Sequence, residues 1–179
     1  MQLRIRKARL ADCDELTRIA HAAKRFWCYP EKLIRLWDRD LTITPDFIVQ
    51  HFMCCAVRDS SVVGFYALSG KRSSRELEHM WVDPKWIGSG VGRSLFTHLL
   101  RHLRRTGVRR LSIASDPNAE GFYRKLGARR IGSVPSRPAG RRLPLLVFHL
   151  RSGRRSTPRL ERTGAQPAHH GQAAAGAGR

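Results

Sequence analysis

A glycine-rich stretch that joins a strand to a helix is the segment of this sequence best suited to binding chemistry. It reads GSGVGR over residues 88–93 and leads into apolar residues at 3.6-residue spacing. The first amides of a helix lack intrahelical partners and carry partial positive charge, and glycine lets a phosphate approach the backbone closely. Arg93 adds a full charge. The stretch therefore predicts an anion site, with a ligand-free tight turn as the alternative.

Two common nucleotide loops do not fit this stretch. The dinucleotide fingerprint Gly-x-Gly-x-x-Gly fails because Arg93 stands where its last glycine belongs. The phosphate loop of NTPases ends in Gly-Lys-Ser/Thr, which the stretch lacks. The sequence around residues 88–93 thus argues against both classes.

The stretch instead resembles the acetyl-CoA loop of the GNAT superfamily of N-acyltransferases, Arg/Gln-x-x-Gly-x-Gly/Ala. Gly90 and Gly92 match, and Ile87 replaces the usual Arg or Gln. A second motif agrees, because residues 118–128, NAEGFYRKLGA, are similar to the short GNAT helix that follows a strand. The resemblance covers about residues 2–150. It implies an α/β (α+β) fold with a central mixed, mostly antiparallel sheet, flanked by helices and splayed between its fourth and fifth strands.

The resemblance also implies an activity, which is transfer of an acetyl group from acetyl-CoA, as co-substrate, to a primary amine of a small molecule or peptide. No metal is implied. A CoA-binding sensor without turnover is the alternative within the same fold, and a homodimer is compatible with the sequence. The cofactor-binding residues that the resemblance implies are Met80, Val82, Ile87, Gly88, Ser89, Gly90, Val91, Gly92, Arg93 and Asn118.

Two catalytic residues are expected from the chemistry and from the resemblance. A carboxylate can take the proton of the amine, and Glu78 is the best candidate, with His79 as the alternative base. Strand alternation places Glu78 on the face of Met80 and Val82, and His79 on the face of Leu77 and Trp81. Backbone amides near residues 80–82 would polarise the carbonyl.

Tyr123 matches the tyrosine that protonates the thiolate in many GNAT enzymes. The structural alternatives are an exposed ion pair for Glu78 and plain packing beside Phe122 for Tyr123. Asn118 is expected to cap the helix of Tyr123, although GNAT proteins more often carry an asparagine at the position of Asp116. The aromatic residues Phe26, Trp27, Tyr29 and Trp37 either shape an acceptor site or pack a helical cap onto the sheet.

The elements that must position these residues can be read from periodicity and turn signals. Asp12 is expected to cap the first helix, with Glu15 completing a capping box. Residues 135–142 read as a loop because they are rich in proline, glycine and arginine. Expected strands are 2–8, 52–57, 62–68, 76–82, 110–114, 128–134 and 145–150, and expected helices are 12–24, 31–38, 45–49, 91–103 and a short one around 123.

Composition bounds the remaining possibilities. The 179 residues carry a net charge of +20 with a pI of about 11.5. Such a charge allows nucleic-acid binding, which would require the positive charge to cluster on one folded face. With no recognised motif for it, we do not expect nucleic acid as the main partner.

The organisation of the chain follows from its composition as well. Residues 1–150 are expected to form one domain, and residues 151–179 a disordered basic tail poor in large apolar residues. The four cysteines show no Cys-x-x-Cys spacing and are expected to be reduced and buried, with Cys54 and Cys55 on opposite faces of a strand. No apolar run approaches membrane-spanning length, so we expect a cytoplasmic protein without a membrane partner.

Overall fold

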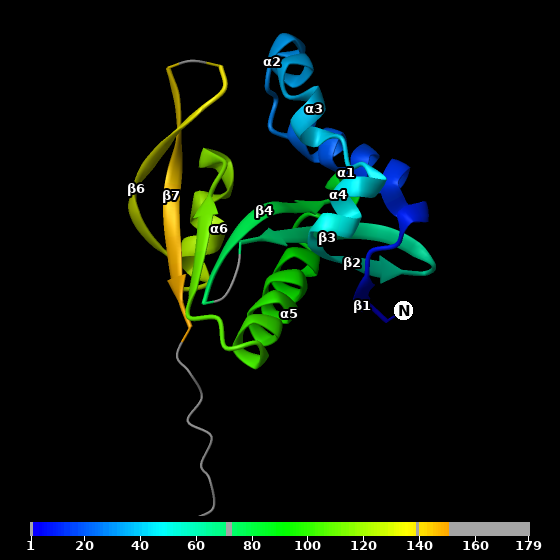
Figure 1. Ribbon diagram of the computed structural model, residues 1–179. Helices are drawn as coiled ribbons and strands as arrows, with labels where there is room; N and C mark the ends of the chain where they lie inside the picture. The colour runs from blue at the N-terminus through cyan, green and yellow to red at the C-terminus, as the bar shows by residue number, and fades with distance from the viewer. Residues whose placement is uncertain (1, 71–72, 139, 151–179) are drawn as a thin grey trace, which may run out of the picture.

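The computed structural model describes residues 2–70, 73–138 and 140–150 (Figure 1). The expected basic tail, residues 151–179, lies outside the described residues. Within the described part, no helix is both long and apolar enough to cross a bilayer.

One seven-stranded sheet forms the centre of the molecule, in the order β1-β2-β3-β4-β5-β7-β6. Only β4 and β5 run parallel, and the other neighbours are antiparallel, which confirms the mixed, mostly antiparallel sheet. The β2–β3 hairpin turns through Asp59 and Ser60, whose φ angles of 48° and 68° suit the twist of a two-residue hairpin turn. The strands are β1 (Arg4–Lys7), β2 (Phe52–Arg58), β3 (Ser61–Ser69), β4 (Ser74–Val82), β5 (Arg110–Ala114), β6 (Arg129–Ser136) and β7 (Arg141–His149).

Helices cover both faces of the sheet (Figure 1). One face carries α1 (Cys13–Phe26), α2 (Glu31–Leu36), α3 (Asp38–Leu41) and α4 (Pro45–Gln50), and the other carries α5 (Val91–Arg105) and α6 (Glu120–Lys125). Short 3₁₀ turns lie at η1 (Leu10–Asp12), η2 (Pro84–Trp86) and η3 (Pro117–Ala119). The apolar stripe predicted for α5 is confirmed, because every one of its members is buried, namely Val91, Leu95, Phe96, Leu99, Leu100 and Leu103.

Two separate hydrophobic cores result, one on each face of the sheet. Cys54 belongs to the core under α5 and Cys55 to the core under α1, which confirms that they point to opposite faces. Both thiols are buried and free. The expectation of burial is wrong for Cys28, which is exposed beyond the end of α1, and Cys13 is only partly buried.

Two local predictions need correction. Asp12 does not cap α1, because its own backbone is already helical (φ −87°, ψ −9°) and its carboxylate turns back to Arg6, at 2.7 and 2.8 Å, and to the Arg9 amide. Glu15 consequently pairs with Arg18 instead of completing a capping box. The predicted loop over residues 135–142 is also too long.

Strand pairing in the β6–β7 hairpin continues through Pro135 opposite Arg142 and Ser136 opposite Arg141. Sequence composition gave the opposite expectation because proline usually interrupts a sheet. Here β6 is the last strand of the sheet, so a residue without an N–H group is tolerated on its open edge. The hairpin therefore reaches further than predicted, toward α2 (Figure 1).

Candidate active site

The sheet opens between β4 and β5, as the sequence predicted. The two strands pair only at Ser74 with Arg110, Arg75 with Leu111 and Glu76 with Ser112. Beyond Glu76 the described residues show no further β4–β5 pairing, so this edge of β4 is free up to Val82. A free strand edge offers backbone amides and carbonyls to a ligand.

A β-bulge at Glu78 breaks the alternation of side chains along β4. His79 lies opposite Ala67 and Leu77 opposite Leu68, so Glu78 has no partner on β3. Leu77 consequently packs in the same core as Met80, while His79 contacts the aromatic residues of the other core. The predicted face shared by Leu77 and His79 is therefore wrong, because a bulge shifts the register by one residue.

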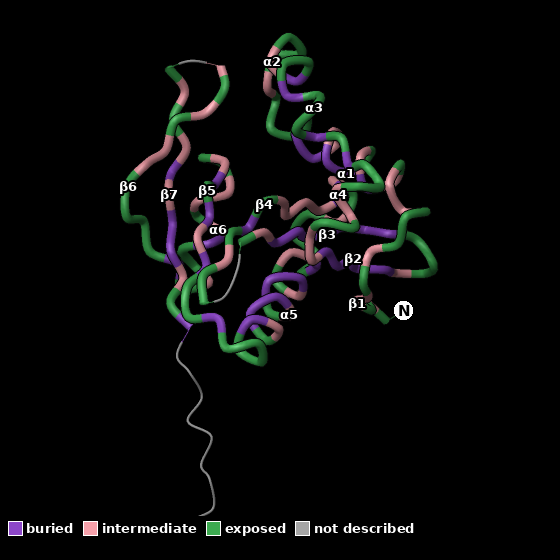
Figure 2. Tube along the Cα trace, in the orientation of Figure 1, coloured by how far each residue is buried: buried purple, intermediate pink, exposed green. Residues whose placement is uncertain are grey.

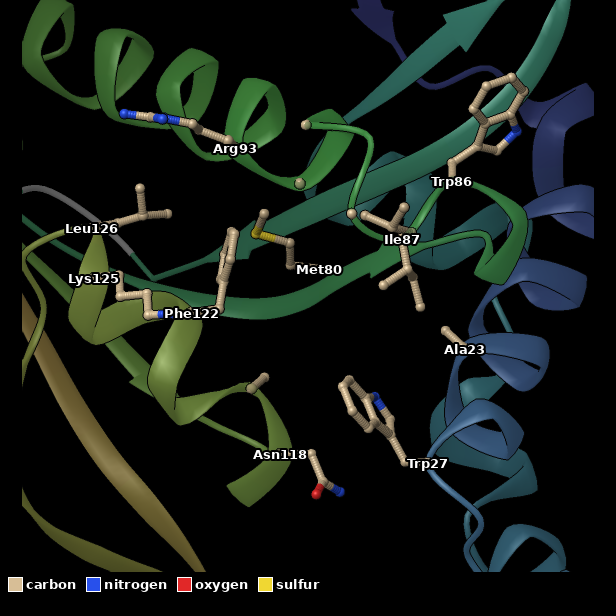
Figure 3. Close-up of a pocket in the computed structure, with 15 residues that line it drawn as sticks. Ala23, Trp27, Met80, Trp86, Ile87, Arg93, Asn118, Phe122, Lys125 and Leu126 are labelled. Atoms are coloured by element: carbon tan, nitrogen blue, oxygen red, sulfur yellow. The ribbon is translucent and has the colours of Figure 1, made fainter.

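A cavity of about 510 Å³ lies beside the open part of β4 (Figure 3). Of the predicted cofactor-binding residues, Ser89 and Val91 do not line it, because Ser89 donates to the Trp86 carbonyl at 2.6 Å and Val91 is buried in the core. Those that line it are Met80, Val82, Ile87, Gly88, Gly90, Gly92, Arg93 and Asn118. The rest of the wall was not predicted from the sequence to bind the cofactor. It consists of Ala23, Trp27, Trp86, Ala119, Phe122, Lys125 and Leu126.

The glycine loop forms one wall of this cavity with its backbone. Gly88 and Gly90 have φ angles of +84° and +87°, which L side chains rarely adopt, and a Cβ at either position would project into open space. The first intrahelical bond of α5 runs from the Ser94 amide to the Gly90 carbonyl, at 3.0 Å. The amides before Ser94 therefore have no acceptor within the helix, which is the arrangement of an anion cradle.

The charge of the cavity matches such a cradle. Arg93 and Lys125 line it, and none of its described lining residues is acidic. Trp27 and Asn118 lie together at one end, away from Arg93 and Lys125 (Figure 3). Gly92 instead serves packing, since a Cβ there would meet Phe122 at 3.5 Å and Val82 at 3.6 Å. The cavity thus offers positive charge at the loop end and an apolar wall along β4.

Tyr123 lies behind the cavity wall. It is 6 % exposed, does not line the cavity, and packs against Phe122 and Phe96, with ring centroids 5.1 and 5.7 Å away. Burial, and then the nearby charge of Asp116, raise the pKa of the Tyr123 phenol well above its usual range. The hydroxyl therefore keeps its proton, while its neighbour Phe122 faces the cavity.

The two candidate bases differ in their surroundings. Glu78 is exposed at the bulge, and its carboxylate accepts a hydrogen bond from the Ser69 hydroxyl. His79 is packed near Phe47, Phe65 and Trp81, and burial lowers its pKa to about 4. The Trp81 indole donates to His79 Nδ1 at 2.9 Å, so His79 is neutral and carries its proton on Nε2. Neither side chain lines the cavity.

A cluster of paired charges closes the opposite end of the site. Lys24, only 7 % exposed, places its Nζ 2.5 Å from Asp116 Oδ2. The Tyr29 hydroxyl donates to the same carboxylate at 3.0 Å, and Arg141 lies 3.7 Å from it. Lys24 Nζ also lies 4.5 Å from the Trp37 ring centroid. We call this group the Lys24 cluster, consisting of Lys24, Tyr29, Trp37, Asp116 and Arg141.

The Lys24 cluster joins the two halves of the open sheet. Lys24 comes from α1, Asp116 from the segment after β5, and Arg141 from β7. Asn118 belongs to its rim, because the side-chain amide donates to the Tyr29 hydroxyl at 3.2 Å. Asp116, and not Asn118, caps the turn before α6 by accepting the Asn118 amide, so the cap predicted at Asn118 is wrong.

The structure separates the four aromatic residues singled out in the sequence. Trp27 lines the cavity, with Phe26 beside it at a centroid distance of 5.2 Å, and both are partly exposed. Tyr29 and Trp37 belong to the Lys24 cluster, where the Trp37 indole also donates to the Arg137 carbonyl at 2.8 Å. A role of Phe26 and Trp27 in binding the acceptor stays a prediction.

Comparison with known proteins gives one family. The model of the acetyltransferase (GNAT) family matches residues 13–128. The peptidyl-lysine N-acetyltransferase YjaB of Salmonella typhimurium is 28 % identical over 133 residues, which is 65 % of this chain and 88 % of the relative. YjaB of Escherichia coli is 28 % identical over 135 residues, covering 65 % and 86 % of the two chains.

Solved structures share the fold. The PaiA N-acetyltransferase of Thermoplasma acidophilum, in complex with coenzyme A, superposes with a TM-score of 0.71 at 18 % identity, covering 84 % of this chain and all of that one. The ribosomal-protein-S18-alanine N-acetyltransferase of Escherichia coli gives 0.62 at 17 % identity, with 83 % and 94 % coverage. At these identities the likeness concerns the arrangement of strands and helices.

Proposed function

The chain belongs to the GNAT family of acetyltransferases and is an acetyl-CoA-dependent acyltransferase, and on this premise we propose that it acetylates a primary amine, with a peptidyl lysine as the acceptor. The observation that carries the proposal is the cavity between the glycine loop and the open edge of β4. The two YjaB relatives, which are peptidyl-lysine N-acetyltransferases by name, support the proposal that the acceptor is a peptidyl lysine.

The residues of the cavity suit acetyl-CoA at both of its ends. The unpaired amides at the start of α5, together with Arg93 and Lys125, would hold its phosphates. The free edge of β4 from Leu77 to Val82 would pair with its amide-containing arm as an added strand does. Acetyl-CoA supplies a thioester whose carbonyl carbon an amine can attack. An amide of the β4 edge would stabilise the oxyanion that forms there.

Proton transfer is assigned to two side chains, one on α6 and one on β4. We assign the acid role to Tyr123, supported by a buried phenol that holds its proton next to a cavity-lining residue. We assign the base role to Glu78. Its position at the bulge, where it has no pairing partner on β3, supports this assignment. Glu78→Gln should slow transfer at neutral pH and recover rate at alkaline pH, where the amine is already neutral. An unchanged pH profile would overturn the base role of Glu78.

The acceptor class is tested by release of free thiol from acetyl-CoA with three probes. These are a peptide with a blocked N-terminus and one internal lysine, a peptide with a free N-terminus and no lysine, and a small polyamine. We expect the lysine peptide to give the highest kcat/KM. Preference for the free N-terminus or the polyamine would overturn the acceptor. Absence of release with all three, in protein whose melting temperature acetyl-CoA still raises, would overturn amine transfer itself.

A further inference from the structure

A second concentration of positive charge follows α5 and shares Arg93 with the cavity. Residues 84–115 contain seven Lys and Arg and not one Asp or Glu, and residues 84–150 contain fourteen against two. By contrast, residues 1–83 carry fourteen Lys and Arg against eleven acids. The excess charge of the described domain therefore comes almost entirely from its C-terminal half, which includes α5 and the strands that follow.

Helix α5 presents this charge along its solvent side. Its buried stripe packs on the sheet, and the opposite side carries Arg93, Arg101, Arg104 and Arg105, all exposed. Figure 2 shows α5 buried along the sheet and exposed away from it. At 100° per residue these four arginines fall within about one third of the helix circumference. They thus form one row, about the length of the helix.

A groove follows the same side of the helix. It has a volume of about 460 Å³ and lies between α5 and the segment around β1. Its walls combine cationic and hydroxyl groups of α5 with two aliphatic side chains, and the lining is Leu3, Ile5, Arg93, Ser94, Thr97, His98 and Arg101. No acidic residue is among them, so the charged side chains of the groove, Arg93 and Arg101, are both positive.

Two further cations join the row at the end of α5. Lys7 Nζ lies 5.6 Å above the Phe52 ring, which in turn stacks on His102 at a centroid distance of 3.8 Å. Burial lowers the pKa of His102, and the charges of Arg105, Arg75 and Lys7 lower it further, which places all three within electrostatic range. We define the basic face as Lys7, Arg75, Arg93, Arg101, Arg104 and Arg105.

The charge of the basic face is not neutralised within the part of the chain that the structure describes. None of its six members forms an ion pair there, whereas Arg6, Arg18, Arg25 and Arg141 elsewhere each lie within 4 Å of a carboxylate. Cations that repel one another with no local counter-charge attract polyanions strongly.

The chemistry of the face discriminates between polyanions. Interfaces with proteins are anchored by buried aromatic and aliphatic residues, and membrane-surface helices insert apolar side chains. The exposed large hydrophobic residues of the described chain all lie outside the basic face, at Leu10, Phe26, Trp27, Leu36, Val49, Ile87 and Ile131. Arginine, with its planar fork of donors, suits phosphate groups in particular.

We propose that the basic face docks the phosphate backbone of nucleic acid independently of base sequence. From the sequence, nucleic-acid binding required the positive charge to be clustered on one face of the fold. The face formed by α5 and its flanking strands meets that requirement. Binding would be driven by release of counterions. The members of the basic face other than Arg93 do not line the acetyl-CoA cavity. The inference stands independently of the proposed acceptor.

The test uses the full chain and a fluorescein-labelled 20-base-pair duplex of arbitrary sequence, titrated at several NaCl concentrations. The variant R101E/R104E/R105E reverses three charges of the basic face and spares Arg93, which also lines the cavity. K32E/R35E/R39E is the matched control, because it makes the same change in net charge at exposed positions on α2 and α3. Melting curves and the acetyl-CoA-induced shift verify that both variants fold.

We expect the basic-face variant to weaken duplex binding at least tenfold, and to flatten the slope of log K against log[NaCl] by about 2.7 for three lost phosphate contacts. The control should weaken binding several-fold less. Equal loss in both variants would overturn the proposal, because net charge alone would then explain binding. It would also be overturned if poly-glutamate competed as well as duplex at equal charge, or if phosphatidylserine vesicles bound more tightly than the duplex.

Discussion

The two ends of the cavity use charge in opposite ways. At the loop end, Gly90, Arg93 and Lys125 offer amides and cations that the described protein leaves without acidic partners. At the other end, Lys24 is buried and pairs with the carboxylate of Asp116, whose side chain is 11 % exposed. The charges at one end are therefore available to a ligand, whereas those at the other end are already paired within the protein.

This difference separates binding from stability in the same site. Unpaired, solvent-facing cations contribute little to folding and bind anions readily. A buried ion pair is costly to break, because removing one partner leaves the other charged and desolvated. Substitutions at the loop end should therefore change ligand affinity, and substitutions at the Lys24 cluster should change the free energy of unfolding.

Tyr123, behind the cavity wall, gives the largest expected effect. Tyr123→Phe keeps the ring packing against Phe96 and removes the only proton that the side chain can donate. General acid catalysis typically contributes ~10²–10⁴-fold, so kcat should fall by that order while acetyl-CoA affinity stays nearly unchanged. Rates come from thiol release and affinity from calorimetry. An unchanged kcat would show that Tyr123 only packs the wall.

Asp116→Asn tests whether the far end is structural. It leaves the Lys24 ammonium buried without its carboxylate, and the free energy of unfolding should fall by about 3–5 kcal/mol. Adding Lys24→Met should restore most of the loss, since neither charge is then buried. Urea denaturation of both variants measures this difference.

The control for Asp116 is an exposed ion pair on the same side of the molecule. Glu31→Gln breaks the Arg25–Glu31 pair, whose side chains are half exposed, and should hardly change the urea midpoint. If Asp116→Asn is as well tolerated as Glu31→Gln, the Lys24 cluster contributes no more than a surface pair. The comparison between the two ends would then fail.

Local signals predicted the loop end, and long-range contacts built the rest. The strand, the glycine loop and α5 are contiguous in the chain, so spacing and periodicity were enough to find them. Lys24 and Asp116 are 92 residues apart, and no local pattern connects them. The bulge at Glu78 was also missed, because a one-residue shift in strand pairing leaves no mark in the alternation of Leu77, Glu78 and His79.

His79 is connected to the Lys24 cluster by Trp81. The Trp81 indole donates a hydrogen bond to His79, and its ring centroid lies 5.8 Å from Lys24 Nζ. Because the pKa of His79 is about 4 in the folded protein and ordinarily 6.5, the unfolded chain binds more protons between these values. Its contribution to stability is therefore complete above pH 6.5 and is lost as the pH falls toward 4. The loss should amount to about 3 kcal/mol.

His79→Gln should remove this part of the pH dependence and keep an acceptor for the Trp81 indole. Chemical denaturation at pH 7.5 and pH 4 measures the difference between wild type and variant. His149→Gln, at an exposed position of β7, is the matched control and should follow the wild type. If the His79 variant followed the wild type as well, the histidine would not be held neutral by burial.

Substitution at the loop end should have a small effect on folding and a selective effect on ligand binding. Gly90→Val and Gly107→Val both place a side chain at a positive φ, +87° and +74°, with open space around the added Cβ. Each should cost about 1–2 kcal/mol of backbone strain. Only Gly90 borders the cavity, where the added methyl groups would project into the anion cradle.

Acetyl-CoA affinity should therefore fall more than tenfold in Gly90→Val and stay near the wild-type value in Gly107→Val, as measured by calorimetry. Because the two variants share their strain, a difference in affinity between them reports the position of the side chain and not the stability of the fold. An equal loss in both would mean that strain at either end of α5 disturbs the cradle. Retained affinity in Gly90→Val would mean that the phosphates of acetyl-CoA bind elsewhere. The loop end of the cavity would then not be the ligand-binding end.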